Sequence, residues 1–532
     1  MRPRDLGDSF FGEVTRTADI AVRLGGLDPF LNTARAVAVA RWGAGVAAMV
    51  AGSAMRYPKR VAISDATGEI TYSELDRQAS ALGCYFQEAG GEGAVGILCR
   101  NHRWFLSAQV GAERAGADLV LLSTALPGPK LAEVVEREGI TTLVVDHEFR
   151  DVVEAADLDI EVVVADGEGP GSLAEVASHQ GRCPSPTRRS RLVLLTSGTT
   201  GPPKGARREN KAPGFDSLGM FAHVPYRMGD QYFVGPPLFH AWGLSQATVA
   251  LATGSTLHLR PRFDVDETLT LLREQRIDVL AVVPLMLRRL LRGAADHPPM
   301  RRPRLVLSSG NVLAGGLAIN WMNRFGDRLY NFYGSTETAI GTIATPHELR
   351  RAPGTVGRAP RGVTVGILDP EGMPVPAGTL GRVHLASSMQ FSGYTDGTDR
   401  ERTGTLMATG DLGWLDQDGL LHVEGRVNDM IVTGGENVFP SRVEEVLEHH
   451  PDVEMAAVVG VDDEDYGQRV VAFVVPVPGV AIDVDDLLEA AGRELQSFKV
   501  PREVRVVDSL PMTTTGKVVR HRLAVLGEAK RV

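Results

Sequence analysis

The sequence predicts an α/β protein: a large N-terminal domain of doubly wound sheets plus a β-rich subdomain, with a small mobile α+β C-terminal domain. Between residues 94 and 308, short apolar segments alternate with helical patterns, which is typical of parallel sheets covered by helices. After about Ala352, glycine, proline and threonine become dense and strands short, which favours a β-rich unit over 352–427. From residue 428 the rhythm changes again, so we expect domains over 1–427 and 428–532.

The N-terminal elements can be placed in order. Residues 1 to about 55 are expected to form a helical extension, and two strands around a Thr67-Gly68 turn predict a hairpin. A helix then runs from Ser73 towards Gln87. Strands are predicted at Ala94–Cys99, Asp118–Leu122, Thr141–Asp146, Leu192–Leu195, Gln231–Val234, Ser255–Leu259, Val279–Val283 and Leu305–Ser308. Helices are predicted at Trp104–Arg114, Lys130–Glu138, Trp242–Ala252, Asp266–Glu274 and Leu285–Arg292. Residues 167–191 are expected to form a polar connection.

The C-terminal third is predicted to contain shorter elements. The β-rich part should hold strands at Gly366–Leu368, Gly381–Leu385 and Leu421–Glu424. The last domain should hold helices at Ser441–His449 and Val484–Gln496, and strands at Met455–Gly460, Val470–Val475 and Glu503–Val507. Its length of about 100 residues is ordinary for one domain.

Composition excludes several function classes. The net charge of the 532 residues is −10, so no overall field favours nucleic acid or an anionic membrane, and any phosphate site must be local. Three widely spaced cysteines (Cys84, Cys99 and Cys183) predict a reducing cytoplasm without disulfides or a zinc site. No secretory signal is expected. The most apolar stretch, Trp42–Met55, has 14 residues without a charge, and about 20 are needed to span a bilayer, so a packed amphipathic helix is predicted, with weak membrane attachment as the alternative.

The segment Leu192–Arg208 combines an apolar strand with a loop suited to phosphate. The loop contains Thr196, Ser197, Gly198, Thr199, Thr200, Gly201, Pro202, Pro203 and Lys204. Small residues let the backbone approach an anion, hydroxyl and amide groups donate to phosphate oxygens, and lysine neutralises charge. It is not a Walker A loop, because Lys204 is followed by glycine rather than by serine or threonine. A flexible surface loop is the alternative.

Two further segments carry acids. Leu329–Thr338 (LYNFYGSTET) places small residues and Glu337 after an apolar strand, where a carboxylate beside phosphates could hold Mg²⁺. Ala408–Asp411 reads as a tight turn whose carboxylate could accept hydrogen bonds from two ribose hydroxyls. Alone, each is equally compatible with an ordinary helix start or turn.

Two glycine-containing segments follow towards the C-terminus. Gly425-Arg426-Val427-Asn428-Asp429 precedes Gly434-Gly435-Glu436-Asn437, and Pro511–Lys517 reads as a polar loop with a lysine at its tip. Lone loop lysines are usually solvated.

Taken together and in this order, the segments resemble those of the AMP-forming acyl-CoA synthetases, the superfamily that includes peptide-synthetase adenylation domains and firefly-type luciferases. The likeness runs from about Tyr57 to Lys517 and is most specific at TSGTTGPPKG, YGSTE, TGD, GRVND to GGENVFP, and PMTTTGK. FHAWG, FKVP and the N-terminal helix are most similar to bacterial fatty-acyl and aryl-acid CoA ligases.

The resemblance implies a reaction in two halves. A carboxylate attacks the α-phosphorus of ATP to give an acyl-adenylate and pyrophosphate, and a thiolate, usually that of CoA, then displaces AMP. The expected cofactors and co-substrates are ATP, Mg²⁺ and CoA. The expected partners are a small-molecule acid and CoA, without nucleic acid or a transmembrane segment; a homodimer and a carrier protein are left open.

The resemblance also implies roles for single residues. Thr196 to Lys204 hold the β- and γ-phosphates, Thr336 contacts the α-phosphate, Glu337 binds Mg²⁺, and Tyr333 lies against adenine. Gly310, Gly334 and Ser335 complete the ATP site, and Asp411 and Arg426 bind the ribose. Lys517 is the catalytic lysine, which bridges the substrate carboxylate and the α-phosphate. His240 and Trp242 are assigned to the acyl pocket, with His240 as its gate, and Gly434, Gly435 and Asn437 to the CoA tunnel.

Two positions depart from the family pattern. The hinge is normally aspartate or lysine and is Asn428 here, a residue that tolerates unusual backbone angles. Asn311 stands where alanine or serine is usual, next to Ser308-Ser309-Gly310. We expect it to be a buried amide in the acid pocket, which would favour an acid with a polar or aromatic substituent.

Other functions are compatible with parts of the sequence. The same adenylation chemistry could load a carrier protein, or activate nitrite in an ATP-dependent diazotase of an aryl amine. Gly243–Ala247 nearly matches the nucleophile elbow of a serine hydrolase, but its last glycine is missing and no strand precedes it. A catalytically dead nucleotide sensor is disfavoured because Glu337, Asp411, Arg426 and Lys517 are all present.

Overall fold

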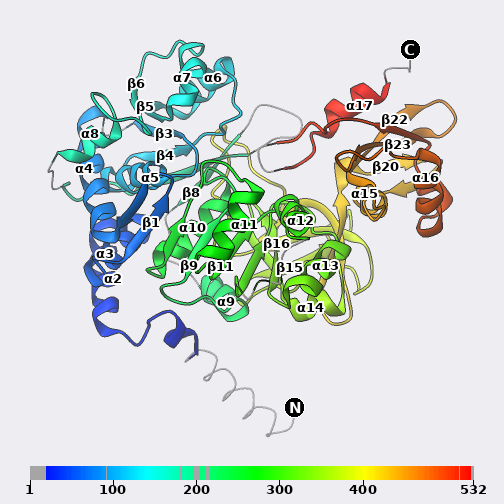
Figure 1. Ribbon diagram of the computed structural model, residues 1–532, viewed down its shortest axis with the longest axis horizontal. Coiled ribbons are helices and arrows are strands. Elements are labelled where there is room, and N and C mark those ends of the chain that lie inside the picture. Colours follow the sequence, from blue (N-terminus) through cyan, green and yellow to red (C-terminus); the bar gives the residue numbers. More distant parts are fainter. Residues whose placement is uncertain are drawn as a thin grey trace, which may run out of the picture.

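The computed structural model describes residues 19–90, 93–179, 183–196, 204–209, 215–295, 298, 300, 302–513 and 516–528. Its elements form four sheets, and the six-stranded sheet is inserted between the first two strands of the eight-stranded sheet and the rest of that sheet (Figure 1). The α/β fold class expected from the alternating pattern is confirmed. Among the described residues, no helix combines the length and apolar character needed to cross a membrane.

The N-terminal extension is helical as predicted, and its described residues form a helical stretch at 19–23 followed by two longer helices. α2 (Pro29–Trp42) begins after Asp28, whose side chain accepts from the N–H groups of Phe30 and Leu31. α3 (Val46–Arg56) buries seven of its residues against the rest of the domain, which explains its lack of charge. The uncharged stretch is therefore a packed helix, as predicted.

The first large sheet has six strands in the order β6-β5-β3-β4-β7-β8. The strands are β3 (Ala94–Leu98), β4 (Asp118–Leu121), β5 (Ile140–Val145), β6 (Glu161–Val164), β7 (Arg191–Thr196) and β8 (Lys204–Glu209). The helices around it are α4 (Tyr72–Gly90), α5 (Arg103–Ala115), α6 (Gly128–Glu138), α7 (Arg150–Glu154) and α8 (Leu173–Ser178). All strand pairs are parallel except β7 with β8. The predicted polar connection 167–191 was wrong in part, because it contains α8.

The second large sheet has eight strands in the order β14-β13-β12-β11-β9-β10-β1-β2. They are β1 (Val61–Asp65), β2 (Gly68–Thr71), β9 (Gln231–Val234), β10 (Thr256–His258), β11 (Val279–Val282), β12 (Leu305–Ser308), β13 (Leu329–Ser335) and β14 (Ala339–Ala344). The helices are α9 (Phe215–His223), α10 (Ala241–Ala252), α11 (Val265–Glu274), α12 (Pro284–Gly293), α13 (Gly315–Phe325) and α14 (Pro346–Arg351). One apolar core, around α3, α4, α5 and α10, lies between this sheet and the first, and a second core lies under α11, α12 and α13.

The β-rich part forms an antiparallel sheet, β15-β16-β18-β17, with β19 beside β18. Its strands are β15 (Thr364–Leu368), β16 (Gly381–Ala386), β17 (Arg402–Thr403), β18 (Leu406–Leu415) and β19 (Leu421–Arg426). β18 contains Ala408–Asp411, so the expected tight turn at these residues was wrong. Gly410 has φ +82°, which makes the strand irregular at this residue. Glycine adopts such angles in turns as well, so the sequence is compatible with either structure.

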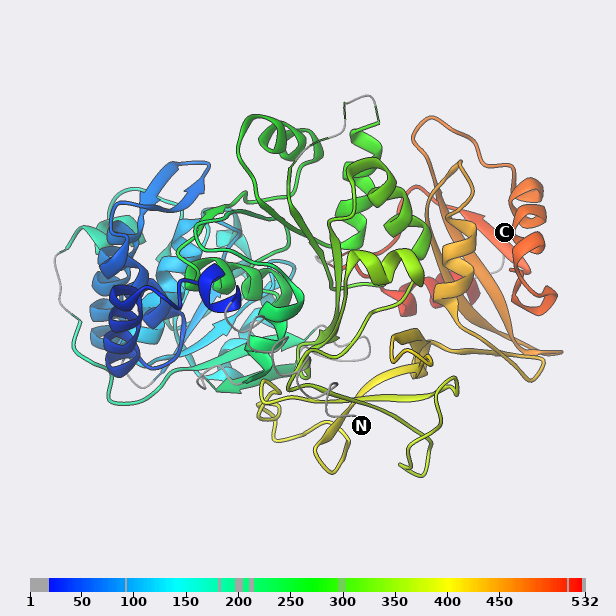
Figure 2. The same cartoon turned by 90° about the horizontal axis from the view of Figure 1, so that it is seen from below.

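The C-terminal sheet has the order β21-β20-β23-β22, with β24 beside β23, and encloses two apolar cores of its own. Its strands are β20 (Ile431–Thr433), β21 (Glu436–Val438), β22 (Val453–Asp463), β23 (Gly467–Pro476) and β24 (Glu503–Val506). Its helices are α15 (Pro440–Leu447), α16 (Val484–Glu494) and α17 (Arg520–Glu528). The C-terminal domain and the yellow β-rich sheet lie on the side away from the N-terminal helices (Figure 2). After β24 the chain turns back towards the eight-stranded sheet before α17 (Figure 1).

Candidate active site

The predicted phosphate loop lies at the tip of a β-hairpin. Thr196 ends β7 and Lys204 begins β8, and the two residues are paired across the antiparallel strands. The Thr196 hydroxyl donates to the Lys204 carbonyl oxygen at 3.2 Å. Ser197, Gly198, Thr199, Thr200 and Gly201 lie outside the described residues. The Lys204 ammonium points away from the strand pair and meets Asp396 at 2.9 Å and the Thr398 hydroxyl at 3.0 Å.

Glu337 is held in the turn between β13 and β14. The Ser335 hydroxyl oxygen accepts from the N–H groups of Glu337 and Thr338, which is a local turn that serine favours. A Cβ at Gly334 would lie 1.9 Å from the Ala339 carbonyl oxygen, so the chain can pass here only with glycine. On the other side, the guanidinium of Arg208 donates to the Thr336 carbonyl oxygen at 2.5 Å. The turn is therefore fixed before any ligand contacts it.

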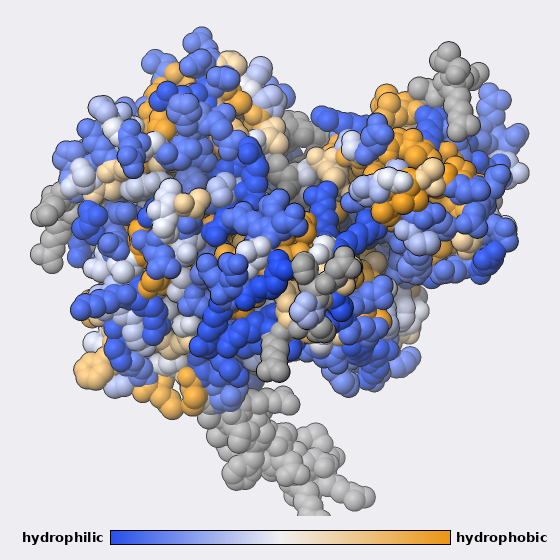
Figure 3. Space-filling view, in the orientation of Figure 1, coloured by the Kyte–Doolittle hydropathy of each residue, from blue (hydrophilic) through white to orange (hydrophobic). Residues whose placement is uncertain are grey.

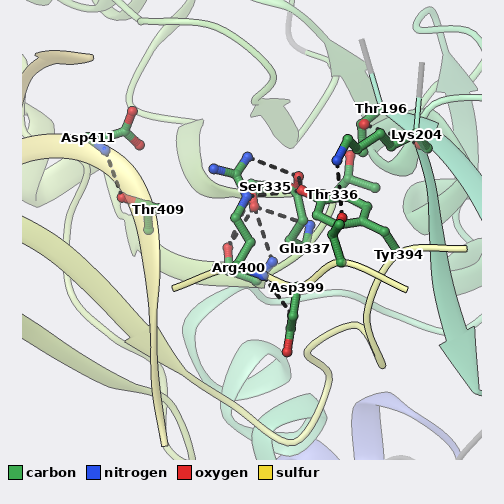
Figure 4. A network of polar contacts seen from close by, with 12 residues as sticks. Thr196, Lys204, Ser335, Thr336, Glu337, Tyr394, Asp399, Arg400, Thr409 and Asp411 are labelled. Atoms are coloured by element: carbon green, nitrogen blue, oxygen red, sulfur yellow. Dashed lines mark hydrogen bonds and ion pairs between the residues drawn. The ribbon is translucent and has the colours of Figure 1, made fainter. Parts of the chain in front are cut away.

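The Glu337 carboxylate faces two polar side chains from the segment after β16. The Tyr394 hydroxyl donates to Oε1 at 2.6 Å, and Arg400 Nη2 forms an ion pair with the same oxygen at 3.1 Å (Figure 4). Burial alone would raise the pKa of Glu337, but Tyr394 and Arg400 outweigh it and the pKa lies below its ordinary value. Glu337 is therefore a buried, ionised carboxylate at neutral pH.

Asp411 on β18 is, like Glu337, a carboxylate contacted by a tyrosine and an arginine. The Tyr333 hydroxyl donates to its Oδ2 at 2.6 Å, and Arg426 Nε lies 2.9 Å from its Oδ1. Asp411 and Arg426 are paired across β18 and β19, so the sheet sets the distance between them. The pKa of Tyr333 is raised well above its ordinary value by burial and by the charge of Asp411. Tyr333 and Arg426 therefore each bind a different oxygen of the Asp411 carboxylate and fix its orientation.

Lys517 is brought to these residues from the C-terminal domain. The turn before it is closed by a hydrogen bond from the Lys517 N–H to the Thr513 hydroxyl at 3.1 Å. Gly516 packs against Leu285 at the start of α12, where a Cβ would approach the leucine at 3.1 Å. Burial and the charge of Arg426 lower the pKa of Lys517, while Asp411 and Glu337 act in the opposite direction. Among the described residues the Lys517 ammonium has no ion pair, and the side chain keeps an exposed surface although protein groups surround it closely enough to lower its pKa.

The residues assigned to the acid pocket lie next to Lys517. His240 directly precedes α10, without a capping hydrogen bond from its side chain, and its pKa is lowered to about 4 by burial and then by the charge of Lys517, so it is neutral at pH 7. Trp242 donates from Nε1 to the Val282 carbonyl oxygen at 2.9 Å, and its ring lies 5.0 Å from that of Phe332. The rigid tryptophan and the neutral histidine give this end of the site an apolar character.

Asn311 does not have the environment that the sequence predicted. Its side chain is exposed, and its Nδ2 donates to the Gly516 carbonyl oxygen at 3.4 Å, so the expectation of a buried amide was wrong. The preceding Gly310 has φ +91°, which turns the chain after β12 towards the lysine loop. Asn311 therefore contacts the C-terminal domain, and it no longer supports a polar or aromatic acid.

The other residues assigned by resemblance lie on the C-terminal domain. Gly434 and Gly435 form the turn between β20 and β21 with φ +58° and +86°, and the Gly434 N–H donates to the Tyr466 carbonyl oxygen at 2.9 Å. Gly435 and Asn437 are exposed. This turn is exposed on the C-terminal domain. Asn428 is exposed within a short 3₁₀ helix, Val427–Asp429, which joins β19 to β20.

Comparison with known proteins places this cluster in a family. The family model described as "AMP-binding enzyme" matches residues 50–395, and the model "AMP-binding enzyme C-terminal domain" matches residues 442–517. The chain belongs to the AMP-binding enzyme family. The two matches include Glu337 and Lys517, and Arg400, Asp411 and Arg426 lie in the segment between them.

Individual relatives of this AMP-binding enzyme are similar over most of their length. An indoleacetate–CoA ligase from Aromatoleum aromaticum is 30% identical over 494 residues, which cover 88% of this chain and 93% of that protein. A fatty acid–[acyl-carrier-protein] ligase from Streptomyces coeruleorubidus is 31% identical over 478 residues, or 85% and 91% of the two chains. The crystal structure of ATP-bound MatB from Rhodopseudomonas palustris has a TM-score of 0.79 at 29% identity and covers 89% of this chain and 98% of that one.

Four functional candidates in this AMP-binding enzyme escaped the sequence analysis: Arg208, Tyr394, Asp396 and Arg400. Arg208 lies on β8, and burial lowers its pKa to about 10 while Glu337 opposes that shift. The other three lie in a stretch of threonine, glycine, aspartate and arginine that resembles a solvated loop. The signal that could have found them is the Gly393-Tyr394 pair, an aromatic residue in an otherwise polar segment.

The side chains around Glu337 fit a magnesium ion. Mg²⁺ is usually bound by one or two carboxylates together with substrate phosphates. Glu337 supplies one ionised carboxylate, and Thr336 and Ser335 supply oxygen atoms in the same turn. Lys204, on the far side of Tyr394, is 5.3 Å from the centre of that ring and can neutralise further phosphate charge.

Proposed function

We propose that this chain is an ATP-dependent, AMP-forming ligase, which activates a carboxylic acid as an acyl-adenylate and transfers the acyl group to the thiol of CoA. The position of Lys517 carries the proposal. A lysine from the C-terminal domain lies within electrostatic reach of Asp411, Arg426 and Glu337 of the large domain. A lysine with a purely structural role would not need two carboxylates and an arginine around its ammonium group. Transfer at the α-phosphorus of ATP, in contrast, needs a cation that offsets the charge on the α-phosphate. The names of the CoA ligase relatives support the choice of acceptor.

The chemistry requires little covalent participation by the protein. An oxygen of the acid attacks the α-phosphorus, the bond from that phosphorus to the oxygen bridging towards the β-phosphorus breaks, and pyrophosphate leaves. Asp411 would accept hydrogen bonds from the ribose hydroxyls, with Arg426 and Tyr333 fixing the carboxylate. Lys517 would bridge the attacking carboxylate and the α-phosphate and stabilise the charge that develops there.

The phosphate end of the site uses three further residues. Thr336 would contact the α-phosphate from a turn that Arg208 and Ser335 hold in place. Glu337 would hold Mg²⁺, which when bound supplies positive charge to the phosphates. Lys204 would contact the β- and γ-phosphates together with the loop that precedes it.

The second half-reaction needs access for a thiol. The sulfur attacks the acyl carbon, the bond to the adenylate oxygen breaks, and AMP leaves. The turn at Gly434 is exposed on the same domain that carries Lys517, and it would reach the acyl-adenylate only after the lysine loop has left the site. We propose that residues 428–532 move as one domain about Asn428, which exchanges the lysine loop for the Gly434 turn.

A carrier protein is the second candidate acceptor. The relative from Streptomyces coeruleorubidus is named as a ligase for acyl-carrier protein and is as similar to this chain as the CoA ligase is. Both acceptors present a thiol to the same acyl-adenylate, so the first half-reaction would be identical.

Pyrophosphate release tests the proposal. The assay would use fatty, aryl and amino-aryl acids and nitrite, each with and without CoA, and with a carrier protein or an aryl amine as alternative acceptors. We expect release with at least one acid, AMP as the spent nucleotide, and turnover that depends on CoA. ADP as product would contradict adenylation. Turnover that needs nitrite and an amine, but no CoA, would identify a diazotase.

A further inference from the structure

Arg400 connects the two halves of the nucleotide site. Its Nη2 forms the ion pair with Glu337 at 3.1 Å, and its Nε donates to the Tyr394 hydroxyl at 3.0 Å. Figure 4 shows the guanidinium on the side of Glu337 that faces the strand carrying Thr409 and Asp411. The side chain retains about a third of its exposure, so a ligand can reach it.

The remaining nitrogen of Arg400 points towards the ribose end. A Cβ at Gly410 would lie 3.4 Å from Arg426 Nη1 and 3.8 Å from Arg400 Nη1. Two guanidinium groups from different segments therefore approach the same point of β18. The lack of a side chain at Gly410 leaves room for both of them and for a ligand that contacts both.

The charges at this point are unbalanced. Arg208, Arg400, Arg426 and Lys517 contribute four positive charges around Glu337 and Asp411, which contribute two negative ones. Arg426 lowers the pKa of Lys517, which is a direct sign of repulsion between the cations. Like charges this close are costly unless an anion lies between them. A polyphosphate supplies that anion.

We propose that Arg400 is an additional nucleotide-binding residue, which contacts the phosphates of ATP between the ribose carboxylate Asp411 and the carboxylate Glu337. The inference rests on the proposed function, because it assigns Asp411 and Glu337 to the two ends of one nucleotide. Arg400 exchanges its contact with Glu337 for phosphate oxygens, to which a guanidinium can donate two parallel hydrogen bonds. Tyr394, which remains bonded to Glu337, keeps the carboxylate in place during the exchange.

Equilibrium binding to the full chain tests this role. Calorimetry would measure the affinities for ATP and for adenosine, with and without Mg²⁺, in the parent and in Arg400→Met. Loss of charge-assisted hydrogen bonds to phosphate should weaken ATP binding by about 10- to 100-fold. Adenosine has no phosphate, so its affinity should stay within about twofold. Arg402→Met is the matched control, since Arg402 lies two residues further on, pairs with Asp399 at the surface, and should leave both affinities unchanged.

The outcomes separate the two proposals. An unchanged ATP affinity in Arg400→Met, or an equal loss for ATP and adenosine, would overturn the role of Arg400 and leave it as a structural partner of Glu337 and Tyr394. A parent chain that binds no ATP would instead overturn the proposed function. Should Arg400→Met fail to fold, Arg400→Gln offers a second neutral side chain with the same expected loss. Either variant is suitable for the comparison if its thermal unfolding midpoint is close to that of the parent.

Discussion

The Lys517 side chain shows how a single residue acquires a role through its surroundings. Partial burial and Arg426 lower its pKa, whereas Asp411 and Glu337 stabilise its charged form. The same ammonium also lowers the pKa of His240, which stays neutral at pH 7 beside the acid pocket. The lysine is thus placed between a nucleotide site of mixed charge and an uncharged acid site.

Replacement of Lys517 by alanine tests that placement. The variant Lys517→Ala should lose adenylate formation by at least about 100-fold, because no other group would offset the charge at the α-phosphorus. Pyrophosphate release measures this step. A chemically prepared acyl-adenylate should still react with the thiol at a rate close to that of the parent, and this reaction is the control for folding. Retained adenylation would mean that the lysine has only a structural role.

At the scale of elements, one helix caps another through a buried acid. Glu113 of α5 accepts from the Ala47 N–H, in the first turn of α3, at 2.9 Å, while Gly45 at the N-terminus of α3 offers no side chain for this purpose. Burial raises the pKa of Glu113 to about 7, although the Ala47 N–H and Arg114 oppose the shift. The folded protein therefore binds a proton that the unfolded chain releases at a lower pH.

This cap makes stability depend on pH. Between the ordinary pKa of glutamate and about pH 7, the folded state holds more protons, so stability falls as pH rises through this window. Glu113→Gln should remove this dependence, and its free energy of unfolding relative to the parent should increase by on the order of 3 kcal/mol from pH 4.5 to pH 8. Urea unfolding across this range measures the difference, and Glu136→Gln, exposed on α6, is the control. A difference between parent and variant that is constant with pH would rule out a shifted Glu113.

The sequence predicted those elements whose segment carries a single strong pattern, either an apolar run or a helical periodicity. β3 is a continuous apolar run and β5 is apolar apart from Thr141 and Thr142, while neighbouring segments carry helical periodicity, so the positions of both strands could be predicted to within a few residues. β8 was missed because its sequence, KGARRE, is polar, and β18 because Thr-Gly-Asp fits a turn as well as a strand with a glycine irregularity. In these cases pairing with a neighbouring strand, which a local pattern does not contain, decided the structure.

The site divides in the same way. Lys204, Glu337, Asp411, Arg426 and Lys517 could be proposed as candidates because each stands in a segment of family-like sequence. Arg400 and Tyr394 were missed because their roles depend on contact with Glu337, more than 50 residues away along the chain. The prediction of a buried Asn311 was wrong because a local pattern does not show whether a side chain is buried. Its amide is exposed and contacts Gly516 of the C-terminal domain.

On the scale of the whole molecule, a net charge of −10 coexists with a local gathering of cations. The face seen in Figure 3 is mainly hydrophilic over the large domain, and hydrophobic side chains gather over the C-terminal domain. The positive groups of the site come from three separate parts of the chain: Lys204 from the six-stranded sheet, Arg400 and Arg426 from the β-rich part, and Lys517 from the C-terminal domain. Their convergence therefore depends on how the domains are held together.

Ion pairs between α12 and the C-terminal domain hold the arrangement in which Lys517 reaches the site. Arg288 forms an ion pair with Glu448 and donates to the Glu454 carbonyl oxygen at 2.9 Å, and both side chains of the ion pair are mostly buried. Arg292, one turn further along α12, donates to the Val453 carbonyl oxygen at 3.0 Å. These contacts lie on the same helix as Leu285, against which Gly516 packs. The interface and the lysine loop are thus fixed by one element.

Weakening this interface should affect one half-reaction. In Arg288→Ala the charge-assisted contacts are lost, at a cost of roughly 1.5 kcal/mol or more, and the arrangement with Lys517 in the site becomes about tenfold less populated. Single-turnover adenylate formation should slow by a similar factor, while the reaction of supplied acyl-adenylate with thiol should be as fast as in the parent or faster. Arg289→Ala removes the neighbouring exposed arginine and should change neither rate. Equal slowing of both half-reactions in Arg288→Ala would indicate a general loss of structure, because only the adenylating arrangement uses the contact between Arg288 and Glu448.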